Sequence, residues 1–163
     1  MQLESVDGLG ALMLTIVGYE FPDDLSDKRT ANWLEIEVQV RTPHGSGTSR
    51  TPCMLTWDVT ECAAWLEALG PQETSLPLVT HFGFPEPNLQ LEVRVQQPQH
   101  IGLHVAFILE RPGQWEMDDM SAQESNRHYV GAMDLLVSRT ALRQAAISLR
   151  ADLQRFPQRT PSA

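Results

Sequence analysis

The stretch from Trp33 to Arg41 alternates apolar and polar residues, and this pattern restricts the fold more than any other part of the chain. Its apolar positions are Leu34, Ile36, Val38 and Val40. Successive side chains of a strand point to opposite faces, so these four share one face and the polar residues between them share the other. The pattern predicts a strand of an antiparallel sheet, with one face in the core and one in water.

Other segments have strand patterns as well. They predict strands at residues 12–17, 49–55, 89–96, 101–109 and 129–137, with a short one at 78–82. Residues 42–48 form a hairpin connection of more than two residues, and residues 97–100 form a turn. Connections this short favour antiparallel pairing, because parallel neighbours need a long crossover.

Two segments have the periodicity of amphipathic helices. Between Cys53 and Pro71 the apolar residues fall on one stripe, formed by Val59, Cys62, Ala63, Leu66 and Leu69. Thr56 or Asp58 can cap this helix, with Glu61 as the capping-box partner of Asp58, and Gly70-Pro71 ends it.

A closing helix begins at Ser138, its predicted cap, and ends before Pro157. Its stripe is Leu142, Ala145, Ala146, Leu149, Leu153 and Phe156. We therefore predict an α+β fold in which an antiparallel sheet of about six strands carries two amphipathic helices on one face. The other face would be open and polar, with Glu35, Glu37, Glu92, Arg94 and His104.

A chain of 163 residues has the size of one ordinary domain, so we expect residues 1–163 to form a single globular unit with a frayed tail at 157–163. No apolar run approaches the ~18 residues of a membrane span. The N-terminus also has Glu4 and Asp7 where a signal peptide needs basic residues. These features predict a soluble, cytoplasmic protein without a membrane partner.

The net charge is −9, and the acidic residues are concentrated in two regions. Residues 1–37 contain eight acidic residues against two basic ones, and residues 110–124 contain five against one. Nucleic-acid binding needs clustered cations, so this balance disfavours it. A cationic protein is the natural complement of such a surface, although acidity also serves solubility alone.

Catalytic and metal-binding motifs are absent from the sequence. It contains no Gly-x-Ser-x-Gly, His-Glu-x-x-His, Cys-x-x-Cys or phosphate-binding glycine loop. His100 and His104 have metal-ligand spacing for a helix, but on the predicted strand the same spacing separates them by ~13 Å. We expect no metal or cofactor, and we expect Cys53 and Cys62 to be buried free thiols.

Two acidic loops are the candidate partner-binding regions, at residues 18–30 and 111–127. The second has neither a helix nor a strand period, and its Trp115 is an aromatic anchor among polar residues. The predicted contact residues are Asp23, Asp24, Asp27, Trp115, Glu116, Asp118 and Asp119.

Two other functional classes remain open. One is a small enzyme with a site at the proline bend, where His81, Glu86 and Asn88 bring polar groups into an apolar neighbourhood that would raise a carboxyl pKa. The other is a structural or interaction domain whose partner the sequence does not indicate.

Several short motifs resemble a known bacterial family, the WapI-type immunity proteins, across roughly residues 12–156. They are Asn32-Trp33-Leu34 before the alternating strand, Pro52-Cys53 followed by Thr56-Trp57 and Trp65-Leu66, and Glu86-Pro87-Asn88-Leu89 before the next strand. The resemblance implies a cytoplasmic protein without catalytic activity that protects its producer by binding a cognate toxin domain. The acidic loop near the N-terminus and residues 111–127 depart from the pattern.

Overall fold

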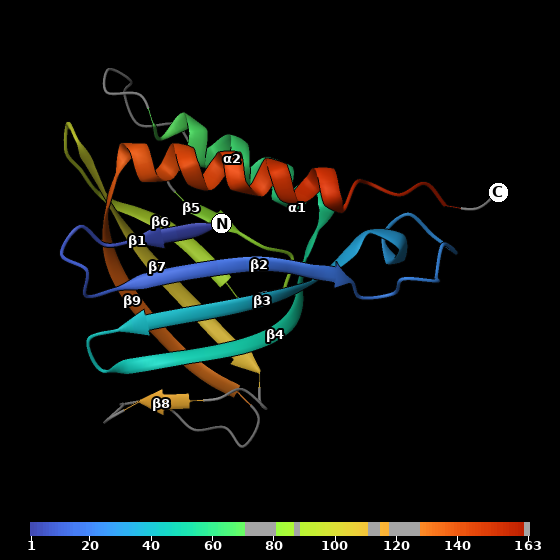
Figure 1. Cartoon of the computed structure of the whole chain (residues 1–163), viewed down its shortest axis with the longest axis horizontal. Coiled ribbons are helices and arrows are strands. Elements are labelled where there is room, and N and C mark those ends of the chain that lie inside the picture. The colour runs from blue at the N-terminus through green and yellow to red at the C-terminus, as the bar shows by residue number, and fades with distance from the viewer. Residues whose placement is uncertain (71–80, 87–88, 111–114, 118–127, 162–163) are drawn as a thin grey trace.

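The computed structural model describes residues 1–70, 81–86, 89–110, 115–117 and 128–161. Within these residues the chain forms two antiparallel sheets and two α-helices (Figure 1). The strand order is β1-β2-β3-β4-β8 in the first sheet and β5-β6-β7-β9 in the second. The α+β class and the antiparallel pairing predicted from the sequence are confirmed.

The elements have the following bounds. The first sheet contains β1 (Gln2–Glu4), β2 (Ala11–Tyr19), β3 (Trp33–Thr42), β4 (Gly45–Leu55) and β8 (Trp115–Met117). The second contains β5 (His81–Gly83), β6 (Leu89–Gln96), β7 (His100–Glu110) and β9 (His128–Ser138). The helices are α1 (Thr56–Ala68) and α2 (Arg139–Arg155), and a 3-10 turn, η1 (Thr30–Asn32), precedes β3.

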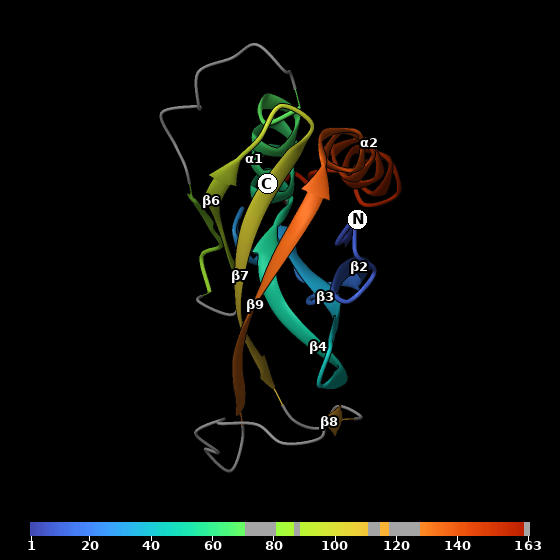
Figure 2. The same ribbon diagram turned by 90° about the vertical axis from the view of Figure 1, so that its left-hand side faces the viewer.

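The prediction of one sheet of about six strands was wrong. The two sheets face each other, and both helices lie side by side across the same end of the pair (Figure 2). This arrangement buries more apolar area, because each strand has only one apolar face and two facing sheets cover each other. Leu14 and Ile36 of the first sheet and Leu103 and Leu135 of the second belong to one core cluster.

The sheets are joined along one side by the segment after β1. The Val6 amide donates to the Leu136 carbonyl of β9 at 2.8 Å, and the Leu136 amide donates to the Ser5 hydroxyl.

Because the strands form two sheets, the residues predicted to share one open polar face lie on two different surfaces. Glu35 and Glu37 lie on β3 of the first sheet, and Glu92, Arg94 and His104 lie on β6 and β7 of the second.

The strand predicted from the alternating stretch is confirmed, since Leu34, Ile36, Val38 and Val40 are all buried. The following hairpin is tighter than expected. Thr42 pairs with Gly45, so the connection contains only Pro43 and His44. The sequence analysis missed β1, and it missed β8, which lies inside the segment predicted to be a loop.

The apolar stripe of α1 is confirmed, because Val59, Cys62, Ala63, Leu66 and Leu69 are buried. The predicted cap was wrong. The Asp58 carboxylate accepts a hydrogen bond from the Leu55 amide at 2.7 Å, so Asp58 takes the role expected of Glu61. Burial raises the pKa of the Asp58 carboxyl, and the bond from Leu55 opposes this shift.

The second helix begins as predicted, with the Ser138 hydroxyl accepting from the Ala141 amide at 3.1 Å. Its first residue, Arg139, is buried and connects neighbouring segments. The Arg139 guanidinium donates to the carbonyls of Leu69, Pro98 and Gln97. This residue thereby joins the end of α1 to the β6–β7 turn.

Neither helix in the described part of the chain is long and apolar enough to cross a membrane. Cys62 is a free, buried thiol, as expected, whereas the side chain of Cys53 lies outside what the structure describes. In the register of β3 and β4, Cys53 falls between Pro52 and Met54 without a partner on β3, which marks a β-bulge just before α1.

Burial raises the pKa of the Cys62 thiol to about 12. We therefore predict that a Cys53→Ser variant, in which Cys62 is the only cysteine, resists a thiol reagent at pH 8 to 9 in the native state. The same variant should react within minutes in concentrated urea. Time-resolved labelling followed by mass spectrometry checks this, and fast native labelling would show that the face of α1 that carries the thiol is not packed against the core.

Candidate protein-binding site

The loop at residues 20–29 connects β2 to η1 and carries three of the predicted contact residues, Asp23, Asp24 and Asp27. It lies at one end of the first sheet, beside the chain that leaves α2 (Figure 1). All three aspartates are exposed. This end of the molecule therefore presents carboxylates to solvent.

Hydrogen bonds within the loop fix two of these carboxylates. Bonds from the Ser26 hydroxyl and amide hold the pKa of Asp24 below its ordinary value. Asp27 has a lowered pKa because the Thr30 hydroxyl donates to it, as do the amides of Thr30 and Arg29. Both side chains thus stay ionised at neutral pH and keep a defined orientation.

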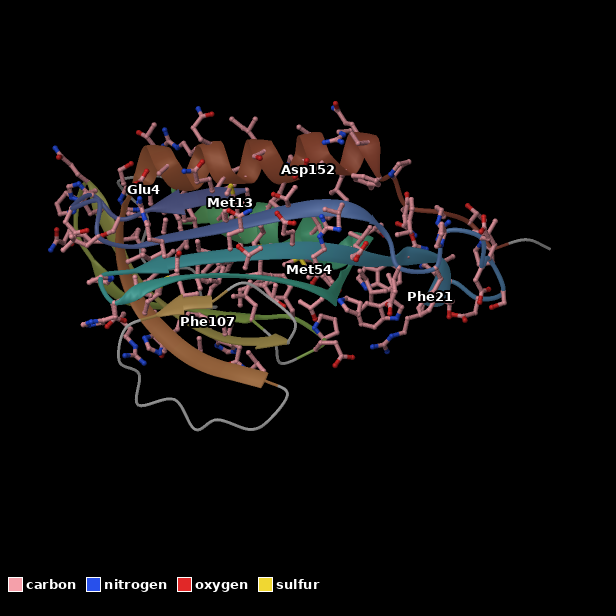
Figure 3. The ribbon with its side chains drawn as sticks, turned by 60° about the horizontal axis from the view of Figure 1, so that its bottom comes forward. Glu4, Met13, Phe21, Met54, Phe107 and Asp152 are labelled. Atoms are coloured by element: carbon pink, nitrogen blue, oxygen red, sulfur yellow. The ribbon has the colours of Figure 1, made fainter. Side chains whose placement is uncertain are left out.

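Two tryptophans lie beside the acidic loop, and a phenylalanine lies within it. The Lys28 ammonium lies 5.5 Å from the ring centroid of Trp57, and the Arg29 guanidinium lies 5.3 Å from that of Trp33. Both tryptophans are partly exposed. Phe21 is 41% exposed and lies at the same end of the molecule (Figure 3).

We call this surface the acidic–aromatic end and define it by Phe21, Asp23, Asp24, Asp27, Trp33 and Trp57. The sequence analysis found its acidic residues but missed its aromatic ones. One signal was available for Trp33, which shares the strand parity of Glu35 and Glu37 and therefore belongs to the polar face. Carboxylates beside exposed aromatic rings suit contact with a cationic protein surface.

A buried amide supports the acidic–aromatic end from below. Asn32 is fully buried, and its side chain donates to the carbonyls of Lys28 and Arg159 at 2.8 and 2.9 Å. Its oxygen accepts from the Thr56 hydroxyl at 3.0 Å and from the Arg159 amide at 2.8 Å. One side chain therefore connects the loop, the start of α1 and the C-terminal tail.

The remaining predicted contact residues do not join this end. Trp115 and Glu116 lie in β8, which pairs with Gly47 and Ser46 at the opposite end of β4. From Gly47 to Leu55, next to the loop, a strand spans about 26 Å. Asp118 and Asp119 lie outside the described residues. Trp115 and Glu116 therefore lie apart from the three aspartates of the loop at residues 20–29.

A shallow depression of about 330 Å³ lies on the outer face of the first sheet, near β8. Its lining includes Gln2, Glu4, Met13, Gln39, Arg41 and Thr48. Two ion pairs lie on this face, Arg41 with Glu4 and, farther along the sheet, Arg50 with Glu37 at 3.0 Å. Both surfaces carry acidic and basic side chains, and at the acidic–aromatic end Lys28 and Arg29 follow the three aspartates.

Of the three residues considered for a polar site at the proline bend, the structure describes His81 and Glu86. His81 is exposed in β5 and pairs with Glu92 of β6, and Asn88 lies outside the described residues. Phe82 contacts the ring of Trp65, with centroids 5.8 Å apart, and Glu86 is partly buried. Aromatic contacts of Phe82 with Trp65 and Phe84 therefore hold the described part of the bend.

The described residues contain no cluster of three or more side chains that could hold a metal ion. His100 and His104 both lie in β7, as the strand prediction required. The Nδ1 atom of His104 is 2.8 Å from a carboxylate oxygen of Asp134 on the neighbouring strand. This contact is an exposed pair on the outer face of the second sheet.

The model of the WapI-like immunity protein family matches residues 2–157, nearly the whole chain. The chain belongs to this family. The family resemblance inferred from short motifs is thereby confirmed, and the match also covers the acidic loop at residues 20–29. Comparison with curated proteins and comparison with solved structures give no match.

Within this family member, Asn32 offers a direct test of how the acidic–aromatic end is held. Asn32→Ala leaves several buried polar groups unpaired, so we expect the free energy of unfolding to fall by about 2 kcal/mol or more. Gln39→Ala is the matched control, because the Gln39 amide bonds Glu37 on the partly exposed sheet face.

The control should change the free energy of unfolding by about 0.5 kcal/mol or less. Urea unfolding followed by circular dichroism measures both variants. Equal losses would show that the Asn32 contacts contribute nothing beyond those of a surface amide.

Proposed function

We propose that the protein neutralises a toxin domain by binding it through the acidic–aromatic end, and that the contacted toxin surface is basic. Family membership over residues 2–157 supports the general role. The observation that carries the choice of surface is the group of three exposed aspartates, two of them fixed by hydrogen bonds, beside partly exposed aromatic rings.

The acidic residues would act mainly on the rate of association. The chain has a net charge of −9, and complementary fields steer two proteins together before contact. Asp24 and Asp27 are already oriented by the loop, so binding need not order them. The entropic cost of association is lower for such fixed groups.

The aromatic residues would act mainly on the lifetime of the complex. Trp33 and Trp57 have large rings that are only partly covered, and such residues provide most of the binding energy in many interfaces. Lys28 and Arg29 already lie near these rings, which shows that cations fit there. Lysine and arginine side chains of the toxin would contact the parts of the rings that Lys28 and Arg29 leave uncovered.

Neutralisation by this route requires no catalysis, because covering the active surface of a toxin is sufficient. We propose that the protein acts in the cytoplasm, where a toxin made by the same cell would do damage. The first experiment is co-expression with the product of the neighbouring open reading frame. Restored growth and a co-purifying complex support the proposal, and a neighbour that is harmless or does not bind contradicts it.

Variants that remove a carboxylate or an aromatic ring separate the contribution to the association rate from the contribution to the lifetime of the complex. Among the three aspartates, Asp23 makes no hydrogen bond in the described structure, so Asp23→Asn removes charge alone. We predict that it slows association about two- to fivefold and flattens its salt dependence. Trp57→Ala should instead speed dissociation about tenfold or more. Stopped-flow kinetics or surface plasmon resonance against the toxin measures both.

The matched control is Glu92→Gln, a half-exposed carboxylate on the outer face of the second sheet, which should leave both rates unchanged. A second group of variants tests the other acidic region. If Trp115→Ala and the pair Asp118→Asn with Asp119→Asn alter the rates while Asp23→Asn and Trp57→Ala do not, the interface lies near β8 and the proposed surface is wrong.

A further inference from the structure

Arg159, beyond the end of α2, makes more contacts with the acidic loop than any neighbouring tail residue in the described structure. Its Nε donates to the Ala31 carbonyl, its Nη1 to the Pro22 carbonyl at 2.6 Å and its Nη2 to the Phe21 carbonyl at 2.8 Å. Two acceptors lie at the start of the loop, and the third, Ala31, lies in η1 directly after the loop. A single guanidinium therefore holds the two ends together.

The tail itself is held in place around this side chain. The Arg159 guanidinium stacks 3.8 Å from the ring centroid of Tyr19, and the Tyr19 hydroxyl donates to the Pro157 carbonyl. Phe156 meets Tyr19 edge to face, with centroids 5.9 Å apart. Residues 157–163 were expected to fray, yet Pro157 and Arg159 are anchored at several points, and residues 162–163 lie outside the described part.

These contacts need the shape of arginine and not only its charge. The three donors of the planar guanidinium point in different directions and reach three carbonyls at once, while one face of the plane covers an aromatic ring. A lysine ammonium keeps the charge but lacks the planar fork. Arg159→Lys thus separates geometry from charge.

We propose that Arg159 is a positioning residue that holds the acidic loop in the conformation that binds the toxin. This inference rests on the function proposed above and adds to it a residue that need not touch the partner. A loop ordered in advance avoids the cost of ordering on binding. Fixing Phe21 and Pro22 also fixes the start of the segment that carries Asp23 and Asp24.

The proposal and simple electrostatics predict opposite signs for one variant. Removing a cation from a surface that meets a basic partner should tighten binding if charge alone matters. Loss of a positioning contact should weaken it. Arg159→Ala therefore decides between the two explanations. Arg159→Lys shows whether a positive charge alone can replace the three hydrogen bonds of the planar guanidinium.

The matched control is Arg155→Ala. Arg155 also lies over an aromatic ring, 5.4 Å from the centroid of Phe156, and it is 3.9 Å from the Asp152 carboxylate. It makes no hydrogen bond to residues 20–32 in the described structure. This variant removes the same charge from the same region and leaves the loop contacts intact.

The experiment has two readouts, one without the toxin and one with it. Hydrogen exchange of the free protein reports on the amides of Ala31 and Asn32, which bond the carbonyls of Asp27 and Arg29 within the loop. Both Arg159 variants should exchange about tenfold faster there and bind the toxin about tenfold more weakly. Arg155→Ala should exchange like the wild type and bind equally or more tightly.

Unchanged exchange in the Arg159 variants overturns the positioning role, even if the toxin contact is real. Faster exchange with unchanged or tighter binding overturns it as well, because the loop conformation then does not matter for the complex. Wild-type protein that binds no toxin overturns the proposed function and this inference together. Thermal melting by circular dichroism confirms that the variants remain folded.

Discussion

Burial of one apolar face per strand is the constraint on which the rest of this structure depends. The strands β2, β3, β6, β7 and β9 each place one row of apolar side chains inward, and two facing sheets closed at one end by α1 and α2 bury all of these rows. Loops are consequently displaced to the ends of the sheets. Polar groups enter the interior where their hydrogen bonds are satisfied, as at Asn32 and Arg139. Asn32 lies directly beneath the acidic loop, so the interior and the candidate site share one network.

Much of the local structure could be predicted from the sequence, because it depends on periodicity. The alternation of Leu34 to Val40 and the stripe of α1 appear in the structure as expected. The number of sheets could not be predicted in this way, since an apolar strand face looks the same whether a helix or another sheet covers it. The bulge at Cys53 has one sequence signal, Pro52, because a proline inside a strand often marks a bulge, whereas β1 and β8 contain only three residues each, too few to show a period.

The candidate site was predictable only in part, for a similar reason. Charge is visible in a sequence, so Asp23, Asp24 and Asp27 could be named as candidate contact residues. Their support was not, because Arg159 and Asn32 hold the loop through backbone carbonyls and amides, which every residue possesses. Nor does charge alone show that Trp115 and Glu116 lie at the far end of β4 from the loop. The tryptophans near the acidic loop were not among the predicted contact residues, although Trp33 has the parity of the exposed strand face.

We propose that this member of the WapI-like immunity family binds a toxin through the acidic–aromatic end. The most direct test is hydrogen exchange of the whole chain with and without the product of the neighbouring gene, resolved by peptide. The account predicts that complex formation increases protection at residues 20–33 and around Trp57, while the outer face of the second sheet, including Glu92 and His104, stays unchanged. Protection confined to that face or to the neighbourhood of β8, in a complex that neutralises the toxin, would contradict the account.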